Sequence, residues 1–461
     1  MRKHETKNRP KSQRRLRLRK TRRNSKISGR IVSRKEGWIV AHIHGDPRER
    51  GFAHGYLLHA ELATIERRMK FIIHNFYGKH MTYSKYSKEC SRHIVPVVER
   101  DFPEYYAEIE GISTGAKSAG VAISTKVLIE WNAMSSMHSY FKDGAKRTKN
   151  QAQRCSAFIA TGSTTKHGDI IMAHNTHCDF PMAATFNIIL YITPDTGMPF
   201  VIQTAPGLIQ SMTDWFISAS GIIGCETTIS NINYRPKFGA PHFCRIRKAI
   251  QYGKSLDDYI AIMKDHNAGD YACSWLLGDI NTNEIMLFEL GLKESNVERT
   301  KNGVFYGANS AMGKALREKE TTDKSHDDTQ TSSGSRNARF NALFAEHPKI
   351  DDTLAQKIIA DHHDSYLKID SMNNRSICRH SELDASPPHK GQHSYYPWGA
   401  TDGKTVNSRQ AKRLEFTGRF GSSCGREFVA EDFLEKHAEY KGWAEFMPDF
   451  PRTEWVNITI N

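Results

Sequence analysis

A sharp change of character at Cys155 constrains the fold of this chain more than any other feature. Residues 142–154 form a polar run whose only apolar members are two alanines. Cys155 then opens an apolar, β-rich run over 156–161, and a turn at 166–169 leads into a second run over 170–173. The pattern predicts a loop that feeds a β-hairpin, with the cysteine at the junction.

This position suits Cys155 to a specific reaction. If the loop were cut between Arg154 and Cys155, the cysteine would become a new chain start, and its thiol would lie within reach of its own α-amino group. That amine titrates near pH ~8, so much of it is a free base at neutral pH. It could then take the thiol proton without a second residue. The sequence therefore predicts Cys155 as a nucleophile, and the alternative is an ordinary buried cysteine before a strand.

The charge of the chain is concentrated at its start. Residues 1–35 contain sixteen Lys and Arg but one acidic residue, so they account for the whole net charge of +14. This composition predicts a disordered basic tail. The tail is either an electrostatic arm for nucleic acid or an anionic surface, or a nuclear address, or a solvated segment without a specific partner. It has no apolar core of a secretory signal, and no run reaches ~18 apolar residues, which favours an intracellular protein.

The rest of the chain divides into two regions of different periodicity. Residues 36–154 begin with a strand over 36–45 and are otherwise mainly helical, whereas 155–461 alternate short β-rich runs with helices. Helices followed by many strands and then helices indicate an α+β fold with stacked layers. The expected strands lie at 156–161, 169–174, 184–193, 199–203, 215–231, 273–280, 283–291 and near 404–419. The expected helices lie at 47–74, with Asp46 as N-cap, and at 86–100, 103–119, 124–138, 242–252, 255–266, 335–346, 351–360 and near 430–440. Residues 315–334 are expected to form a mobile loop, and 385–397 an irregular segment.

Metal and phosphate chemistry find little support in the sequence. The eight cysteines are scattered without a CxxC pair, which predicts reduced, mostly buried thiols and no zinc site. The run Asp361-His362-His363-Asp364 contains ligand types, but adjacent histidines at a helix end are not expected to face one point. HExxH and GxxxxGK[ST] motifs are absent. We therefore expect no metal and no cofactor.

Several short segments, taken in order, resemble the N-terminal-nucleophile (Ntn) hydrolases of the isopenicillin N acyltransferase type and the related phospholipase B-like proteins. Segments 45–55 (GDPRERGFAHG) and 102–112 (FPEYYAEIEGI) resemble the acyltransferase prodomain, and 361–362 and 376–380 (SICRH) are similar to later parts of that group. The phospholipase B-like pieces are C-S-A at 155–157, A-H-N-T at 173–176, E-T-T-I at 226–229 and G-A-T-D-G-K at 399–404.

The resemblance implies a four-layer αββα Ntn sandwich with a helical pro-segment over 36–154 and a catalytic core over 155–461. It implies self-cleavage between Arg154 and Cys155, with both pieces staying together. Cys155 would then form an acyl-enzyme from an acyl amide or acyl ester, lipid included, and hydrolysis or transfer to an amine would complete the cycle. The acyl group, the leaving group and the oligomeric state are left open.

The resemblance also implies roles for residues around Cys155. His174 matches the histidine of A-H-N-T, and would orient the α-amine or move protons, unless it is a satisfied core histidine. Asn309 aligns with an asparagine of the acyltransferase oxyanion hole, and the alternative is a turn asparagine. Asn175 and Asp179 match an N-W-D region loosely and would shape the pocket.

Further residues are predicted to bind substrate. Thr227 or Thr228 would bind substrate or hold the precursor geometry, if they are more than strand threonines. Arg336 and Arg339 match a paired-arginine helix that could bind an anion, and a solvated helix face is the alternative. Trp398 stands where the acyltransferase has an arginine directly before G-A-T, which argues against its β-lactam precursor chemistry.

The sequence leaves two alternatives to an Ntn-type enzyme. An inactive protein that keeps the Ntn fold could bind nucleic acid or an anionic surface through its basic tail. A papain-like protease is disfavoured because Cys155 lacks the C-G-[SA]-C-[WY] surroundings.

Overall fold

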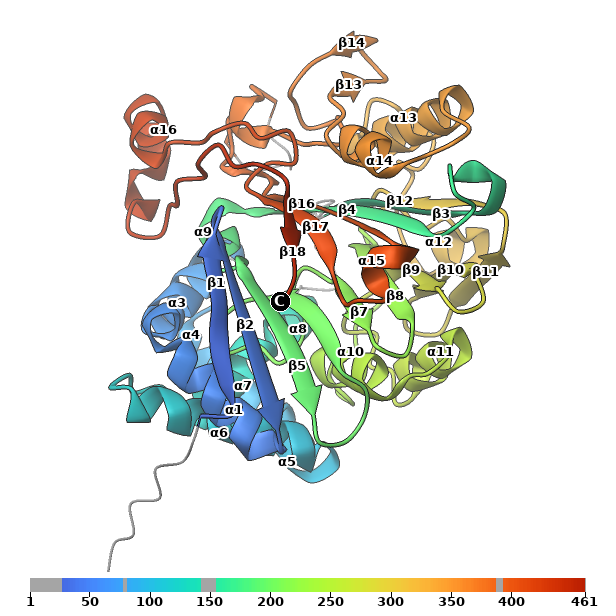
Figure 1. Cartoon of the computed structure of the whole chain (residues 1–461). Helices are drawn as coiled ribbons and strands as arrows, with labels where there is room; N and C mark the ends of the chain where they lie inside the picture. Colours follow the sequence, from blue (N-terminus) through green and yellow to red (C-terminus); the bar gives the residue numbers. More distant parts are fainter. Residues whose placement is uncertain (1–26, 78–80, 142–154, 387–392, 461) are drawn as a thin grey trace, which may run out of the picture.

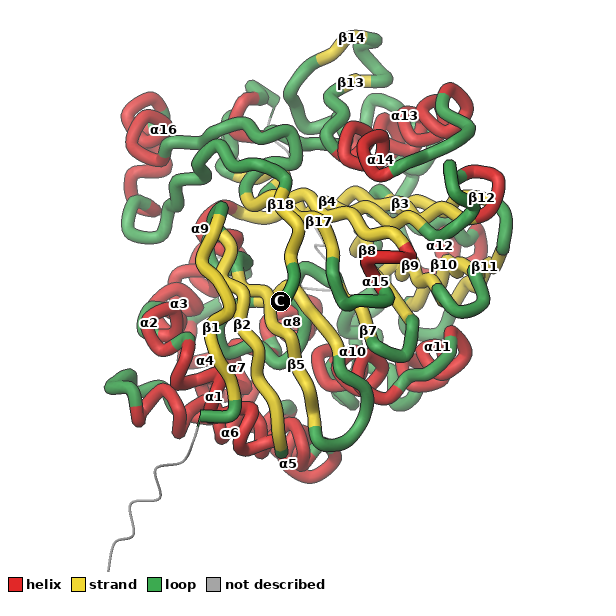
Figure 2. Tube along the Cα trace, in the orientation of Figure 1, coloured by secondary structure: helices red, strands yellow, loops and turns green. Residues whose placement is uncertain are grey.

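A computed structural model describes residues 27–77, 81–141, 155–386 and 393–460. Helices and strands alternate through these ranges, and the α+β class predicted from the sequence is confirmed (Figures 1 and 2). None of the helices in these ranges combines the length and the apolar character that a membrane crossing requires. Residues 1–26 and the whole polar run before Cys155 lie outside the described residues. The tail's partner and the Arg154 cleavage site therefore stay predictions.

The N-terminal region is mainly helical, as predicted, but it starts earlier than expected. Strand β1 covers Gly29–Lys35, so the last part of the predicted disordered tail is ordered, and β2 covers Trp38–Gly45. Asp46 caps the next helix with a full capping box. The helices are α1 (Pro47–Leu57), α2 (His59–Leu62), α3 (Ile65–Phe76), α4 (Tyr83–His93), α5 (Val95–Asp101), α6 (Pro103–Ser118), α7 (Thr125–Asn132) and α8 (Met134–Phe141).

Helices α1 and α6 approach very closely through glycines on both. A Cβ on Gly55 would lie 2.0 Å from the Ile112 carbonyl oxygen, and a Cβ on Gly115 would lie 2.1 Å from that of Phe52. His54 beside them is buried and accepts a hydrogen bond from the Gly207 backbone nitrogen at 2.8 Å. The His54-Gly55 pair therefore serves packing, and it ties α1 to the region after Cys155.

The larger sheet has nine strands in the described part, in the order β1-β2-β5-β6-β7-β8-β9-β10-β11. Strand β2 pairs with β5 in parallel register, so the N-terminal region extends the sheet of the core instead of forming a separate unit. The strands after β2 are β5 (Ile188–Pro194), β6 (Phe200–Thr204), β7 (Phe216–Ser218), β8 (Ile222–Thr228), β9 (Cys273–Asp279), β10 (Glu284–Leu290) and β11 (Ser295–Thr300).

The second sheet contains Cys155 and has seven described strands. Its order is β12-β3-β4-β16-β17-β18, and β15 also pairs with β4. The predicted hairpin is present as β3 and β4, whose register joins Cys155 to Thr176 and Ala157 to His174. The strands are β3 (Cys155–Thr161), β4 (Ile171–Asp179), β12 (Gly303–Gly307), β15 (Trp398–Ala400), β16 (Asp402–Asn407), β17 (Phe416–Phe420) and β18 (Val456–Ile458).

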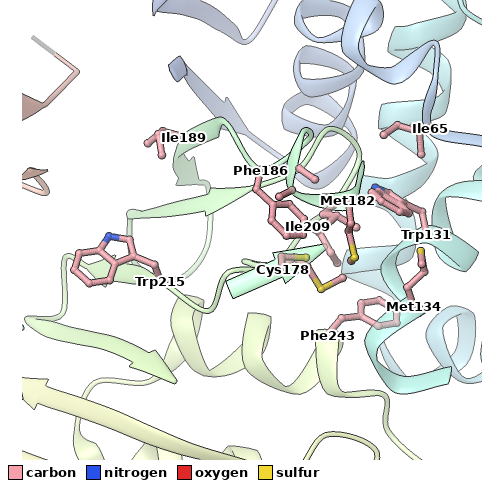
Figure 3. Close-up of a cluster of buried hydrophobic side chains, with 14 of the residues drawn as sticks. Ile65, Trp131, Met134, Cys178, Met182, Phe186, Ile189, Ile209, Trp215 and Phe243 are labelled. Carbon is pink, nitrogen blue, oxygen red and sulfur yellow. The ribbon is translucent and has the colours of Figure 1, made fainter. Parts of the chain in front are cut away.

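Apolar side chains join the two sheets to each other and to helices. One cluster contains Ala157 and Met172 of the second sheet together with Val201 and Cys225 of the first. Figure 3 shows its extension toward the N-terminal helices, where Trp131 and other labelled side chains converge. A separate cluster packs the first sheet on α10 (His242–Tyr252) and α11 (Leu256–Lys264), and another packs the second sheet on α13 (Ser332–Glu346) and α14 (Asp352–Ile359).

The remaining elements lie mostly in the last third of the chain. The polar segment 315–334, expected to be a loop, instead contains most of α12 and the start of α13. Residues 387–392 of the irregular 385–397 segment lie outside the described ranges. These elements are η1 (Gly162–Thr164), α9 (Phe180–Ala183), α12 (Lys314–Glu320), β13 (His363–Asp364), β14 (Ile369–Asp370), η2 (Ser381–Leu383), α15 (Ser408–Ala411), α16 (Ala430–Lys436) and η3 (Ala438–Trp443).

Candidate active site

Cys155 is the first residue of β3, in the interior of the second sheet. It is buried, and its backbone nitrogen donates a hydrogen bond to Asn309 Oδ1 at 3.3 Å. Its Cα partner is Thr176 on β4. Because side chains alternate along strands, Cys155, His174 and Thr176 share one face of the sheet. That face includes Ala157 and packs against the larger sheet.

Arg336 holds the backbone of Cys155 from the other side. The guanidinium, fully buried on α13, donates through Nη1 to the Cys155 carbonyl at 2.7 Å and to Ser156 Oγ at 3.0 Å. Nη2 donates to Asn309 Oδ1 at 3.1 Å. Burial lowers the pKa of Arg336 to about 9, which still leaves it charged at neutral pH. Arg336 thus holds the backbone of Cys155 in place, and its predicted anion-binding role stays a prediction.

Asn309 occupies a tight turn after β12. Its φ of 70° lies in the left-handed region, which asparagine adopts more readily than most residues. Its Nδ2 donates to the Thr228 carbonyl at 2.9 Å, while Oδ1 faces the Cys155 nitrogen. The structure therefore places Asn309 beside Cys155, as predicted. The oxyanion role stays a prediction, since it needs the second N–H of Nδ2.

The surroundings of the Cys155 thiol hold it in the neutral form. Burial raises its pKa well above the usual value, and the carboxyl groups of Glu226 and Asp214 raise it further. A hydrogen bond from the His177 backbone and the charge of Lys404 act in the opposite direction. The thiol therefore needs a base to become a nucleophile.

Glu226 and Asp214 form a buried carboxyl pair that the sequence did not assign to the site. Tyr271 lies against both, with its hydroxyl 2.9 Å from Glu226 Oε1 and 3.0 Å from Asp214 Oδ2. Burial, followed by the charge of Asp214 and a hydrogen bond to it, raises the pKa of Glu226 well above its usual range. Two buried carboxyl groups joined by a hydrogen bond share a proton. The E-T-T-I motif pointed to this segment without giving Glu226 a role.

Lys404 is a second buried charge near the thiol. Its Nζ lies 2.9 Å from Asp402 Oδ1 and 2.9 Å from Thr176 Oγ1, and it is fully buried. Gln203 from the larger sheet accepts a further hydrogen bond from Nζ at 2.7 Å. The ammonium of Lys404 thus links the two sheets beside Thr176, the residue opposite Cys155 on β4. Its motif, G-A-T-D-G-K, was recognised, but the burial of its lysine could not be read from the sequence.

His174 lies on the same face as Cys155, but the described contacts do not join the two side chains. Its Nε2 lies 3.1 Å from the Glu226 carbonyl oxygen, and its Nδ1 is buried without a hydrogen-bond partner. Burial, and then the charge of Lys404, lowers the pKa of His174 well below its usual value. The ring is therefore neutral at physiological pH, and its role in proton movement stays a prediction.

Asn175 faces away from Cys155 and is occupied by structural contacts. Its Oδ1 accepts a hydrogen bond from the Ser156 nitrogen at 3.2 Å. Its Nδ2 lies 2.8 Å from the Ile359 carbonyl oxygen, 3.3 Å from the Ile377 carbonyl oxygen and 3.3 Å from Ser423 Oγ. These contacts give Asn175 a positioning role within the second sheet, and its predicted part in shaping the pocket stays a prediction.

The two threonines behave differently, because they point to opposite faces of β8. Thr227 faces the second sheet, where its Oγ1 is buried without a hydrogen-bond partner next to Gly307. Thr228 lies on the other face, with Oγ1 3.2 Å from Glu226 Oε1 and 3.1 Å from the Tyr271 hydroxyl. Thr227 has a polar group to offer a ligand, and its substrate role stays a prediction.

Three predicted residues lie outside this arrangement. Arg339 forms a two-pronged ion pair with Asp361, with Nη2–Oδ2 at 2.6 Å, and its predicted substrate role stays a prediction. Asp179 lies at the far end of β4 and hydrogen-bonds Tyr396. Trp398 is buried, with the Arg379 guanidinium 4.2 Å from its ring centroid.

Comparisons with known proteins give distant matches. No protein-family model matches the chain. An uncharacterised protein from Archaeoglobus fulgidus is 23% identical over 254 residues, which are 52% of this chain and 41% of that protein. The chain thus spans less than half the length of this curated relative. A variant of conjugated bile acid hydrolase from Clostridium perfringens matches 59% of this chain and 83% of its own, with 10% identity and a TM-score of 0.27. At that score the likeness assigns neither fold nor activity.

Proposed function

We propose that the chain is a self-processing Ntn-type cysteine hydrolase that cleaves an acyl amide or acyl ester through an acyl-enzyme on Cys155. The observation that supports this above all is the grip on Cys155. Asn309 accepts from its nitrogen at 3.3 Å, and Arg336 donates to its carbonyl at 2.7 Å. A nucleophile at a new chain end has to be fixed on both sides in this way, because reactive geometry tolerates little displacement.

The packing of the sheets supports the four-layer αββα part of the proposal. One apolar cluster lies between the two sheets, and separate clusters cover the outer face of each sheet with helices. The order would be α10 and α11, first sheet, second sheet, α13 and α14. In that arrangement Cys155 stands at the end of an interior strand, facing the other sheet.

The first reaction is cleavage of the precursor bond. The Cys155 sulfur attacks the carbonyl carbon of Arg154, the C–S bond forms, and the C–N bond breaks as the thiol proton passes to the released nitrogen. Water then hydrolyses the thioester, which leaves a carboxylate on Arg154 and restores the thiol. The released amine belongs to Cys155, and Asn309 Oδ1 already accepts a hydrogen bond from that nitrogen.

Turnover then uses the sulfur and the α-amine nitrogen of Cys155. The α-amine takes the thiol proton, the sulfur attacks the substrate carbonyl, and the leaving amine or alcohol departs with that proton. Water hydrolyses the resulting thioester, or an acceptor amine takes the acyl group. The raised pKa of the thiol explains why a neighbouring base is needed. The second N–H of Asn309 Nδ2 is the proposed donor to the developing oxyanion.

The decisive experiment is a denaturing gel of the purified chain, with N-terminal sequencing of the larger band. We expect two fragments, of about 154 and 307 residues out of 461, and a sequence that starts Cys-Ser-Ala. Cys155→Ala should give a single full-length band, because the attacking sulfur is missing.

Cys225→Ala is the matched control, since it removes another buried thiol, on β8, that has no part in the proposed chemistry. It should process like the natural chain. A single band for the natural chain after long incubation, or unchanged processing of Cys155→Ala, would refute self-processing.

A further inference from the structure

Two cysteines and two histidines converge near the C-terminal end of α14. The potential ligand atoms of His362, Cys378, His380 and Cys424 all lie within 4.8 Å of one another. His380 Nε2 is 3.4 Å from Cys378 Sγ and 3.5 Å from Cys424 Sγ. A tetrahedral zinc site with Zn–S of ~2.3 Å and Zn–N of ~2.0 Å places its sulfur and nitrogen ligands ~3.5 Å apart. The two sulfur–nitrogen distances at His380 match this spacing.

Backbone contacts of separate segments bring the four residues together. His362 follows the end of α14, and the Cys378 nitrogen donates to the Asp361 carbonyl beside it at 2.9 Å. Cys424 lies in the turn after β17, where the Gly425 nitrogen donates to the Ser422 carbonyl at 2.9 Å. Ligands from three segments of the chain are typical of a site that staples a fold.

The histidines are prepared as ligands. His380 Nδ1 lies 2.8 Å from Glu382 Oε1, which fixes the ring and leaves Nε2 for the centre of the cluster. His362 contacts Cys424 through its side chain, and its buried Nε2 meets no partner at hydrogen-bond geometry among the described residues. A buried ring nitrogen without a partner is costly unless something binds it. The neighbouring His363 turns elsewhere, with Nδ1 2.9 Å from Asp370 Oδ1.

We propose that this cluster binds one zinc ion as a structural Cys₂His₂ site. All four tetrahedral positions are supplied by the protein, which is the arrangement of structural and not catalytic zinc. The proposal departs from the sequence prediction of no zinc site. The spacing of the ligands along the chain, with one close pair at 378 and 380, follows no common motif, so the sequence gives no signal for this site.

The zinc would brace the backbone under the candidate active site. Ile377, directly before one ligand, accepts through its carbonyl from Ser156 Oγ at 3.2 Å and from His177 Nε2 at 3.1 Å. Ser423, directly before another ligand, lies with its Oγ 3.3 Å from Asn175 Nδ2. The ion would therefore fix two of the segments that hold β3 and β4 in place, whatever reaction Cys155 performs.

The test measures metal and not activity. The full chain, purified with reduced thiols and without a metal-affinity tag, is analysed for metal by mass spectrometry of the native protein and by elemental analysis. We expect one zinc per chain. His362→Ala should lose it, and the adjacent His363→Ala should keep it. Chelation should lower the melting temperature of the natural chain more than that of His362→Ala.

Cobalt exchange of the natural chain covers the case in which His362→Ala does not fold. We expect the visible bands of tetrahedral cobalt together with thiolate-to-cobalt charge transfer, both lost in Cys424→Ser. The proposal is overturned if the natural chain contains no stoichiometric metal and binds no cobalt, or if its mass shows a disulfide between Cys378 and Cys424. Zinc retained by the double variant Cys378→Ser/Cys424→Ser overturns it equally.

Discussion

The two faces of the β3–β4 hairpin differ in what their polar groups contact. On the face toward helices α13 and α14, Ser156, Asn175 and His177 all contact the Ile377 carbonyl oxygen. Each face also holds a histidine whose Nδ1 is buried without a hydrogen-bond partner, His177 on the first and His174 on the second. The face toward the larger sheet differs because it carries the Cys155 thiol, which lies in the field of two carboxyl groups. Hydrogen bonds that converge on one backbone oxygen build a scaffold, whereas a thiol beside buried carboxyl groups is a candidate for chemistry.

The largest effect is expected from replacing Arg336, which holds the backbone of Cys155. Arg336→Lys should abolish processing and lower the free energy of unfolding by about 3–5 kcal/mol, since one ammonium cannot replace the hydrogen bonds of a buried guanidinium. Denaturant unfolding and the gel assay measure the two effects.

Arg339→Lys, three residues along the same helix, is the control for that change. Its ion pair with Asp361 is partly exposed, so the expected loss is below ~1 kcal/mol and processing should be normal. Equal losses for the two variants would mean that α13 itself, and not the grip on Cys155, carries the effect.

Neighbouring residues on β4 separate the faces more finely. Asn175→Ala should lower the free energy of unfolding by about 2–3 kcal/mol, because it leaves the buried Ser156 nitrogen and several acceptors unpaired. The protein that remains folded should process at the natural rate. Unfolding curves and single-turnover processing rates are the measurements.

His174→Gln tests the opposite face in the same strand. Its side chain makes one hydrogen bond to backbone in the described contacts, so the stability cost should be about 1 kcal/mol. If His174 assists proton movement, the processing rate should fall without a matching loss of stability. A rate change for Asn175→Ala that exceeds that for His174→Gln would reverse the assignment of the two faces.

The sequence predicted the elements better than the roles. The junction at Cys155, the hairpin and most core helices followed from periodicity, because apolar spacing is a local property. Asn309 and Arg336 were also found, through motif resemblance. Glu226 and Lys404 were not assigned to the site, because their importance comes from burial between distant strands, and the sequence does not show which polar residues become buried together. The ion pair of Arg339 with Asp361 was not predicted, because the two residues are adjacent only in the folded chain.

The smallest effect is expected from the carboxyl pair of Glu226 and Asp214, because it changes stability only through pH. Burial and Asp214 raise the folded-state pKa of Glu226, so the folded chain holds a proton that the unfolded chain releases above pH ~4.3. Stability from this group is complete below that pH and is lost as pH rises toward the folded-state pKa. Glu226→Gln keeps the contacts of Oε1 and removes the titration. Relative to the natural chain, it should therefore gain melting temperature steadily from pH 5 to pH 8, whereas Glu284→Gln, half-buried at the start of β10, should show no such trend. A constant difference in melting temperature between Glu226→Gln and the natural chain across this range would mean that Glu226 is ionised in the folded protein.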